Sequence, residues 1–121
     1  MEKHIVIAFS NADPAEETAF NEWYTKHHVV DMLGVEGIEF ATRYRRDDEP
    51  SAFPVAPQHR YLAIYEIPEE KVDEARRELD AALQVSFEAD AAGTERPWRR
   101  GVGITEMAAA WYTAIDPTRS S

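Results

Sequence analysis

The feature that most constrains the fold of this chain is the order in which strand-like and helix-like patterns follow one another along its 121 residues. Residues 3–10 alternate in the way typical of a β-strand, with Ile5, Ile7 and Phe9 on one face. The later patterns predict a helix from 14 to Gly34, strands over 37–46 and 60–67, a helix from Pro68, an irregular stretch over 86–103, and a strand over 104–115.

The ends of the first helix carry clear signals. Asp13 is a good N-cap, Pro14 suits the first helical position, and Glu16 stands three residues after the cap. Phe20, Trp23, Tyr24, His27 and Asp31 then recur at steps of three and four, which places them on one side of the helix.

The resulting order, β-α-β-β-α-β, predicts a single α+β domain over residues 1–116, with 117–121 as a flexible tail. This is the ferredoxin-like pattern, an antiparallel sheet with two helices on one face. The segment 47–59 contains three prolines, Pro50, Pro54 and Pro57, and we expect a long irregular connection there.

The strands also predict self-association. Since the helices cover one face of the sheet, apolar residues on the other face would form a large exposed patch, which monomers rarely tolerate. We assign to that second face Val6, Ala8, Ala63, Tyr65, Ala108, Ala110 and Tyr112. A second copy of the chain is the commonest partner for such a face, so we expect a homodimer.

Composition excludes several classes of function. A net charge of −10 opposes nucleic-acid binding, because that binding depends on lysine and arginine neutralising phosphates. Without cysteine there is no disulfide, thiolate nucleophile or cysteine zinc site. No apolar run is long enough to span a membrane, and strand pattern begins almost at Met1. We therefore expect a cytoplasmic protein with no membrane partner.

Two adjacent histidines near the end of the first helix are the main catalytic candidates. Asp31 stands four residues after His27 and three after His28, so it can orient either ring. In one interpretation His28 is a general acid or base. In the other, both histidines bind the last carbonyls of the helix and have a structural role. Metal binding needs a further ligand, and neither His4, His59, Glu66 nor Glu106 shows ligand spacing, so we predict no metal.

Arg43 is the candidate for holding an anion, provided that its head faces the interior; facing outward, it is ordinary surface charge. Strand alternation places Arg43 and Tyr44 on opposite faces. Rings with polar tips suit either a cavity for a flat ligand or a plain core. The candidate ligand-binding residues are Trp23, Tyr24, His27, Tyr44, Tyr65 and Trp111.

A family resemblance rests on the first helix and the two strands after it. The helix carries Phe20-x-x-Trp23-Tyr24-x-x-x-His28-x-x-Asp31-Met32-Leu33-x-Val35-x-Gly37, and the strands carry Ala41-x-Arg43-Tyr44 and residues 61–66. This pattern resembles the dimeric α+β barrel superfamily, in particular its small EthD-like proteins. Val30 stands where relatives often have proline, so the helix is expected to continue past it.

The resemblance implies a ligand pocket between sheet and helices, two sheets meeting in a dimer, and His28 as the functional histidine. Such a superfamily hosts several chemistries. We predict an enzyme without a bound cofactor that moves protons on an aromatic or polyketide-like carbonyl compound, as an isomerase, cyclase, lyase or oxygenase. The alternative is a non-catalytic dimeric ligand-binding or accessory protein. Two histidines on a ring-lined helix favour the enzyme.

Overall fold

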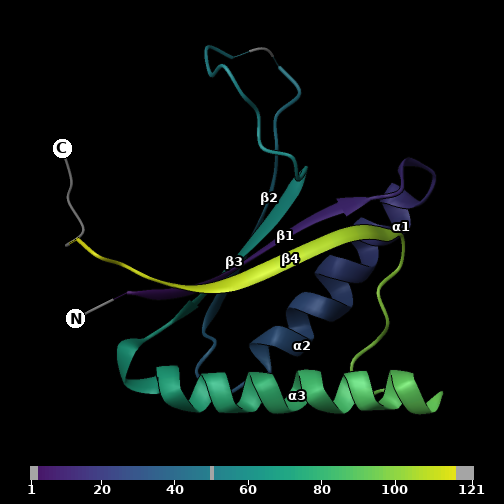
Figure 1. Cartoon of the computed structure of the whole chain (residues 1–121), viewed down its shortest axis with the longest axis vertical. Helices are drawn as coiled ribbons and strands as arrows, with labels where there is room; N and C mark the ends of the chain where they lie inside the picture. Colours follow the sequence, from purple (N-terminus) through teal and green to yellow (C-terminus); the bar gives the residue numbers. More distant parts are fainter. Residues whose placement is uncertain (1–2, 50, 117–121) are drawn as a thin grey trace.

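The four strands form one antiparallel sheet in the order β2-β3-β1-β4, as expected for a ferredoxin-like α+β fold. The computed structural model describes residues 3–49 and 51–116, so the predicted tail 117–121 lies outside the described residues. The helices lie on one side of this sheet (Figure 1). The strands are β1 His4–Ala12, β2 Phe40–Arg45, β3 Tyr61–Ile67 and β4 Ile104–Thr113.

The first helical segment is one continuous run in four parts. These are the 3-10 turn η1 Pro14–Glu16, α1 Glu17–Trp23, the π-helical turn η2 Tyr24–His28, and α2 Val29–Leu33. Asp13 caps it as predicted, because the Ala15 N–H donates to Asp13 Oδ1 at 2.9 Å. The helix continues past Val30 and ends at Gly34, also as predicted.

The second helical segment is longer than the sequence suggested. It begins with η3 Glu69–Lys71 and continues as α3 Val72–Ala92, whose C-terminal cap is Gly93 in the left-handed conformation. The prediction of an irregular stretch from residue 86 was therefore wrong for 86–92. This segment contains no glycine or proline and three alanines, so nothing in it stops a helix that is already formed.

The two faces of the sheet differ from the prediction. Val6, Ala8, Ala63 and Tyr65 were assigned to the face away from the helices, but they are buried beneath the helices. The alternation of residues separates two faces without saying which one meets the helices. The register shows that the predicted set mixed them, since Ala8 pairs with Ala63 and Ala109, while Ala110 pairs with Ile7.

The second face is nevertheless apolar, with other residues. We call it the open face. It carries Ile5, Ile7 and Phe9 on β1, Phe40 and Tyr44 on β2, Leu62 and Ile64 on β3, and Ala108, Ala110 and Tyr112 on β4. Phe40 and Tyr44 are 62% and 52% exposed, so large rings of this face are in contact with water.

The connection between β2 and β3 extends away from the sheet (Figure 1). Its base is fixed, because the Arg46 N–H donates to the Arg60 carbonyl at 2.7 Å and the Arg60 guanidinium binds Asp48 at 2.9 Å. Between residues 46 and 60 the described part has no helix or strand, in agreement with the prediction for 47–59. Among the described residues no helix has the length and apolar character needed to cross a membrane.

Gly37 lies in the turn between α2 and β2 and packs against the start of the second helix. Its replacement tests this packing. Gly37 has φ +97°, and a Cβ atom would lie 3.1 Å from the Cβ atoms of Lys71 and Ala75. Gly37→Ala is expected to destabilise the fold by about 2 kcal/mol, from backbone strain and crowding together. The measurement is urea-induced unfolding followed by circular dichroism.

Gly93→Ala is the matched control for this experiment. Gly93 also has a positive φ, of +70°, but no atom lies within 4 Å of the Cβ that the substitution would add. It should therefore lose only about 1 kcal/mol, from backbone strain alone. An equal loss in the two variants would contradict the packing assigned to Gly37.

Candidate active site

The π-helical turn η2 determines where the functional side chains of the first helix lie. In this turn the Val29 N–H donates to the Tyr24 carbonyl, five residues earlier, so the helix is wider than an α-helix. As a result, the His28 ring stacks on the Trp23 ring, five residues before it, at 5.1 Å and 27°. Such turns are rare and are frequently found at functional sites. Regular 3.6-residue spacing could not predict this pairing.

His28 lies inside a group of aromatic rings. Besides Trp23, the edge of Tyr24 contacts it with ring centres 4.9 Å apart, and Trp98 lies edge-on at 6.1 Å. Trp98 belongs to the segment after α3 and was not among the predicted site residues. It stands next to Pro97 in the irregular segment between α3 and β4, where no periodic pattern assigns a residue to a face of a helix or strand.

This environment keeps His28 uncharged. Burial, together with the nearby positive charges of Arg96 and Arg43, lowers its pKa from 6.5 to about 4. At neutral pH the imidazole is therefore in the form that accepts a proton. The low pKa also makes this imidazole a weaker base than an ordinary histidine.

Arg43 faces the helices, which resolves the two possibilities left open by the sequence. Its guanidinium lies 4.3 Å from the centre of the Tyr24 ring. It donates to Asn21 Oδ1 at 2.9 Å and to Thr25 Oγ1 at 3.0 Å. These partners are neutral, so the positive charge of Arg43 is not cancelled by them. Burial lowers its pKa, although the surrounding tyrosines oppose this effect.

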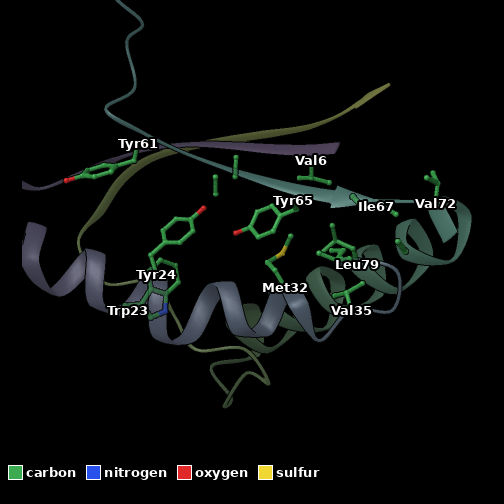
Figure 2. Close-up of a cluster of buried hydrophobic side chains, with 14 of the residues drawn as sticks. Val6, Trp23, Tyr24, Met32, Val35, Tyr61, Tyr65, Ile67, Val72 and Leu79 are labelled. Carbon is green, nitrogen blue, oxygen red and sulfur yellow. The ribbon is translucent and has the colours of Figure 1, made fainter. Parts of the chain in front are cut away.

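The hydroxyl groups of Tyr24 and Tyr65 meet between the first helix and the sheet (Figure 2). Tyr24 is 1% exposed and Tyr65 is fully buried. Burial is the main cause that raises the pKa of each phenol, and Arg43 acts in the opposite direction on both. The two hydroxyls are close enough to influence each other's pKa, but no hydrogen bond of normal geometry to any described residue satisfies either of them. Each of these buried hydroxyls therefore keeps an unused hydrogen-bonding capacity.

Not all of the predicted site residues join this group. Asp31 interacts with His27 and Arg99, and burial is the main cause of its raised pKa. His27 Nε2 lies 3.3 Å from Arg99. Among the contacts of the described residues, none joins Asp31 to His28.

Tyr44 and Trp111 also lie elsewhere. Tyr44 is on the open face, as strand alternation required once Arg43 faced the helices. Trp111 is on β4, where the guanidinium of Arg76 lies 4.6 Å from the centre of its ring. The structure thus brings together Trp23, Tyr24, His28, Arg43 and Tyr65, which we call the ring cluster.

Two hollows lie near the ring cluster, and Arg43 is the member of the cluster that lines the first. A hollow of about 210 Å³ is lined by Asn21, Arg43, Tyr44, Arg45 and Tyr61. A separate groove of about 560 Å³ lies between α2, α3 and Trp98. His28 lines neither of them. Among the described residues, no three His, Cys, Asp or Glu side chains are grouped as a metal site requires.

The described residues thus define a ferredoxin-like α+β chain with a partly buried histidine, two buried tyrosine hydroxyls and an arginine between its sheet and its first helix. No family model matches the chain, and no curated protein matches it either. Comparison with solved structures does give matches.

Three of the matching structures span nearly the whole chain. An EthD family protein from Bacillus halodurans is 13% identical, with 91% of this chain and 97% of that chain covered and a TM-score of 0.46. A dimeric ferredoxin-like protein of unknown function from Thermobifida fusca is 8% identical, with 93% of this chain and 92% of that chain covered and a TM-score of 0.46. A monooxygenase from the ActVA-Orf6 gene of Streptomyces coelicolor, in complex with nanaomycin D, is 18% identical, with 98% of this chain and 92% of that chain covered and a TM-score of 0.47.

An EthD family protein, the kind of protein that the first-helix motif resembles, is among these matches. At TM-scores below 0.5 the likeness contributes nothing to an argument about activity. The function must therefore be argued from the ring cluster.

Proposed function

We propose that this chain is a cytoplasmic enzyme of small-molecule metabolism that works without a bound cofactor and moves protons on an aromatic or polyketide-like carbonyl compound. The observation that supports this most is the neutral, partly buried His28 beside the ring of Tyr24 and near the charge of Arg43. Isomerisation, cyclisation and elimination all begin with such a proton transfer, and oxidation of an activated aromatic compound is a variant.

In the proposed reaction, His28 removes a proton from the carbon next to the carbonyl group. The electron pair of that C–H bond moves to the carbonyl oxygen, which becomes an enolate oxyanion, and the proton stays on the imidazole. The hydroxyls of Tyr24 and Tyr65 donate hydrogen bonds to the oxyanion, and the charge of Arg43 stabilises it through space. Protonated His28 then returns the proton to another position. No step requires Asp31, His27, Tyr44 or Trp111.

We also propose that the enzyme is a homodimer in which two open faces meet. The open face carries large apolar side chains on all four strands, and those of Phe40, Tyr44 and Tyr112 are exposed. A two-fold contact between identical faces would remove them from water. The ring cluster lies on the opposite face of the sheet, so dimerisation leaves it accessible.

A proton-exchange assay tests the chemistry directly. The chain should accelerate deuterium exchange at the carbon next to the carbonyl of 2-tetralone in D₂O, followed by proton NMR. His28→Gln should lower the rate by at least about 100-fold, because it removes the base. Since the pKa of His28 is about 4, the rate should rise as the pH is raised through 4 and change little above it.

His4→Gln is the control, since His4 is on β1 at the distant end of the sheet and pairs with Thr113. It should leave the exchange rate unchanged. Equal rates for the chain and for His28→Gln would refute the role of His28.

One observation favours the alternative, a non-catalytic binding protein. His28 is packed by the rings of Trp23, Tyr24 and Trp98, and it lines neither the hollow beside Arg43 nor the groove beside Trp98. In that case His28 stabilises the helix and 2-tetralone exchanges no faster than in buffer, although aromatic compounds bind. Exchange above the buffer rate that depends on His28 would exclude this alternative.

A further inference from the structure

The segment after α3 carries an arginine that the ring cluster as described does not include. Arg96 is 19% exposed at its side chain and lies 3.5 Å from Asp90 near the end of α3. Arg100 binds the same carboxylate at 2.9 Å, but its side chain is 62% exposed. Between the two, Trp98 packs against His28. Arg96 is thus held on Asp90 close enough for its charge to act on His28, whereas Arg100 lies in solvent.

Two buried N–H groups, one in the ring cluster and one on Arg96, have no acceptor among the described residues. Arg96 Nε and Trp23 Nε1 are both inaccessible to solvent, and neither has a hydrogen-bond partner among the described residues. Trp23 is 6% exposed, and its ring stacks on His28. Indole and guanidinium nitrogens can only donate, and a buried donor without an acceptor costs free energy. Only a group that accepts hydrogen bonds can satisfy them.

The charges around His28 indicate which kind of acceptor fits. The groups facing it are Trp23 and Tyr24 of its own helix, Arg43 of β2, and Arg96 and Trp98 of the segment after α3. Arg43 binds neutral partners, and Arg96 shares its one carboxylate, Asp90, with Arg100. Asp31 is engaged with Arg99 and His27. A local positive excess thus surrounds His28 in a chain whose net charge is −10.

We propose that the substrate is an aromatic carbonyl compound that also carries an ionised acid group, a carboxylate or a phenolate, and that Arg96 binds this group. The proposal rests on the function proposed above and specifies the class of its substrate. The guanidinium of Arg96 supplies a charge-assisted hydrogen bond to the anion. The neutral His28 next to it remains free to accept a proton.

Calorimetric titration with two aromatic probes of the same shape tests this assignment. At pH 7 the chain should bind 1-naphthoate at least about tenfold more tightly than neutral 1-naphthamide, because only the former carries a charge for Arg96. Because the whole chain carries a net charge of −10, non-specific electrostatic repulsion weakens the binding of naphthoate and works against this preference. In Arg96→Met the two probes should bind with affinities within about threefold of each other.

Arg100→Met is the matched control, because it removes the other arginine that binds Asp90 and should keep the preference for naphthoate. If Arg96→Met does not fold, the NMR signals of the His28 ring in the unmodified chain provide a second measurement, since naphthoate at the ring cluster must shift them. Equal binding of the two probes, absence of binding by both at millimolar concentration, or a naphthoate complex that leaves the His28 signals unmoved would overturn the proposal.

The two proposals fail in different ways, because binding of these probes requires no reaction. A preference for naphthoate together with no exchange of 2-tetralone would refute the proposed chemistry and leave the anion site standing. Exchange of 2-tetralone together with equal binding of the probes would refute the anion site alone.

Discussion

Lowering the pH from 6.5 to 4 is expected to destabilise the folded chain by about 3 kcal/mol through His28 alone. The pKa of His28 is 6.5 as an ordinary histidine and about 4 in the fold, chiefly because the ring is buried. Between these values the unfolded chain binds one more proton than the folded chain. The stabilisation is therefore fully present above pH 6.5 and is lost as the pH falls toward 4.

The measurement is urea-induced unfolding at several pH values for the chain and for His28→Gln. The variant lacks the titrating ring, so its stability should change less with pH over this interval, by about 3 kcal/mol. Comparison with the variant is needed because other groups titrate too. Asp31 has a raised pKa, so its contribution has the opposite sign and grows as the pH falls. Parallel curves for the two proteins would show that His28 is exposed to water.

A single aspartate at the centre of the open face is expected to abolish dimerisation. Ile64 pairs with Ile7 on β1 and with Thr42 on β2, so it lies in the middle of this face. In Ile64→Asp, two like charges would have to be buried against apolar surface, one from each copy. The dissociation constant should rise by at least about 1,000-fold, which corresponds to roughly 4 kcal/mol. Light scattering should give a dimer mass for the unmodified chain and a monomer mass for the variant at micromolar concentration.

Ala81→Asp provides the control, because Ala81 is exposed on α3, on the helical side of the molecule. This variant should remain a dimer, and circular dichroism should show that both variants are folded. A monomer mass for the unmodified chain at tens of micromolar would contradict the dimer.

The order and approximate bounds of the elements could be predicted from the sequence because they depend on local patterns. Asp13 and Pro14 specify the start of the first helix, and alternation in residues 3–10 specifies a strand, whatever lies around them. The C-terminal end of α3 could not be predicted in this way. Its polar residues Glu88 and Asp90 suggest a loop when considered alone, but they are the solvent side of a helix that stops only at Gly93.

The candidate site was predicted in part. The sequence proposed Trp23, Tyr24, His28, Arg43 and Tyr65, and the structure brings these five together; their roles stay predictions. It also proposed that Asp31 orients either His27 or His28, and in the structure Asp31 interacts with His27 and with Arg99. Trp98 and Arg96 were missed as members because they are remote in sequence and follow no periodic pattern.

The sequence by itself determined the types of element, their order, and an apolar character on both faces of the sheet, because periodicity and capping are properties of neighbouring residues. Only the tertiary structure decided which face meets the helices, that Arg43 points inward, and that His28 is neutral. These outcomes depend on burial and on charges such as that of Arg96, 68 residues away along the chain (96 minus 28). Such surroundings exist only once the chain has folded.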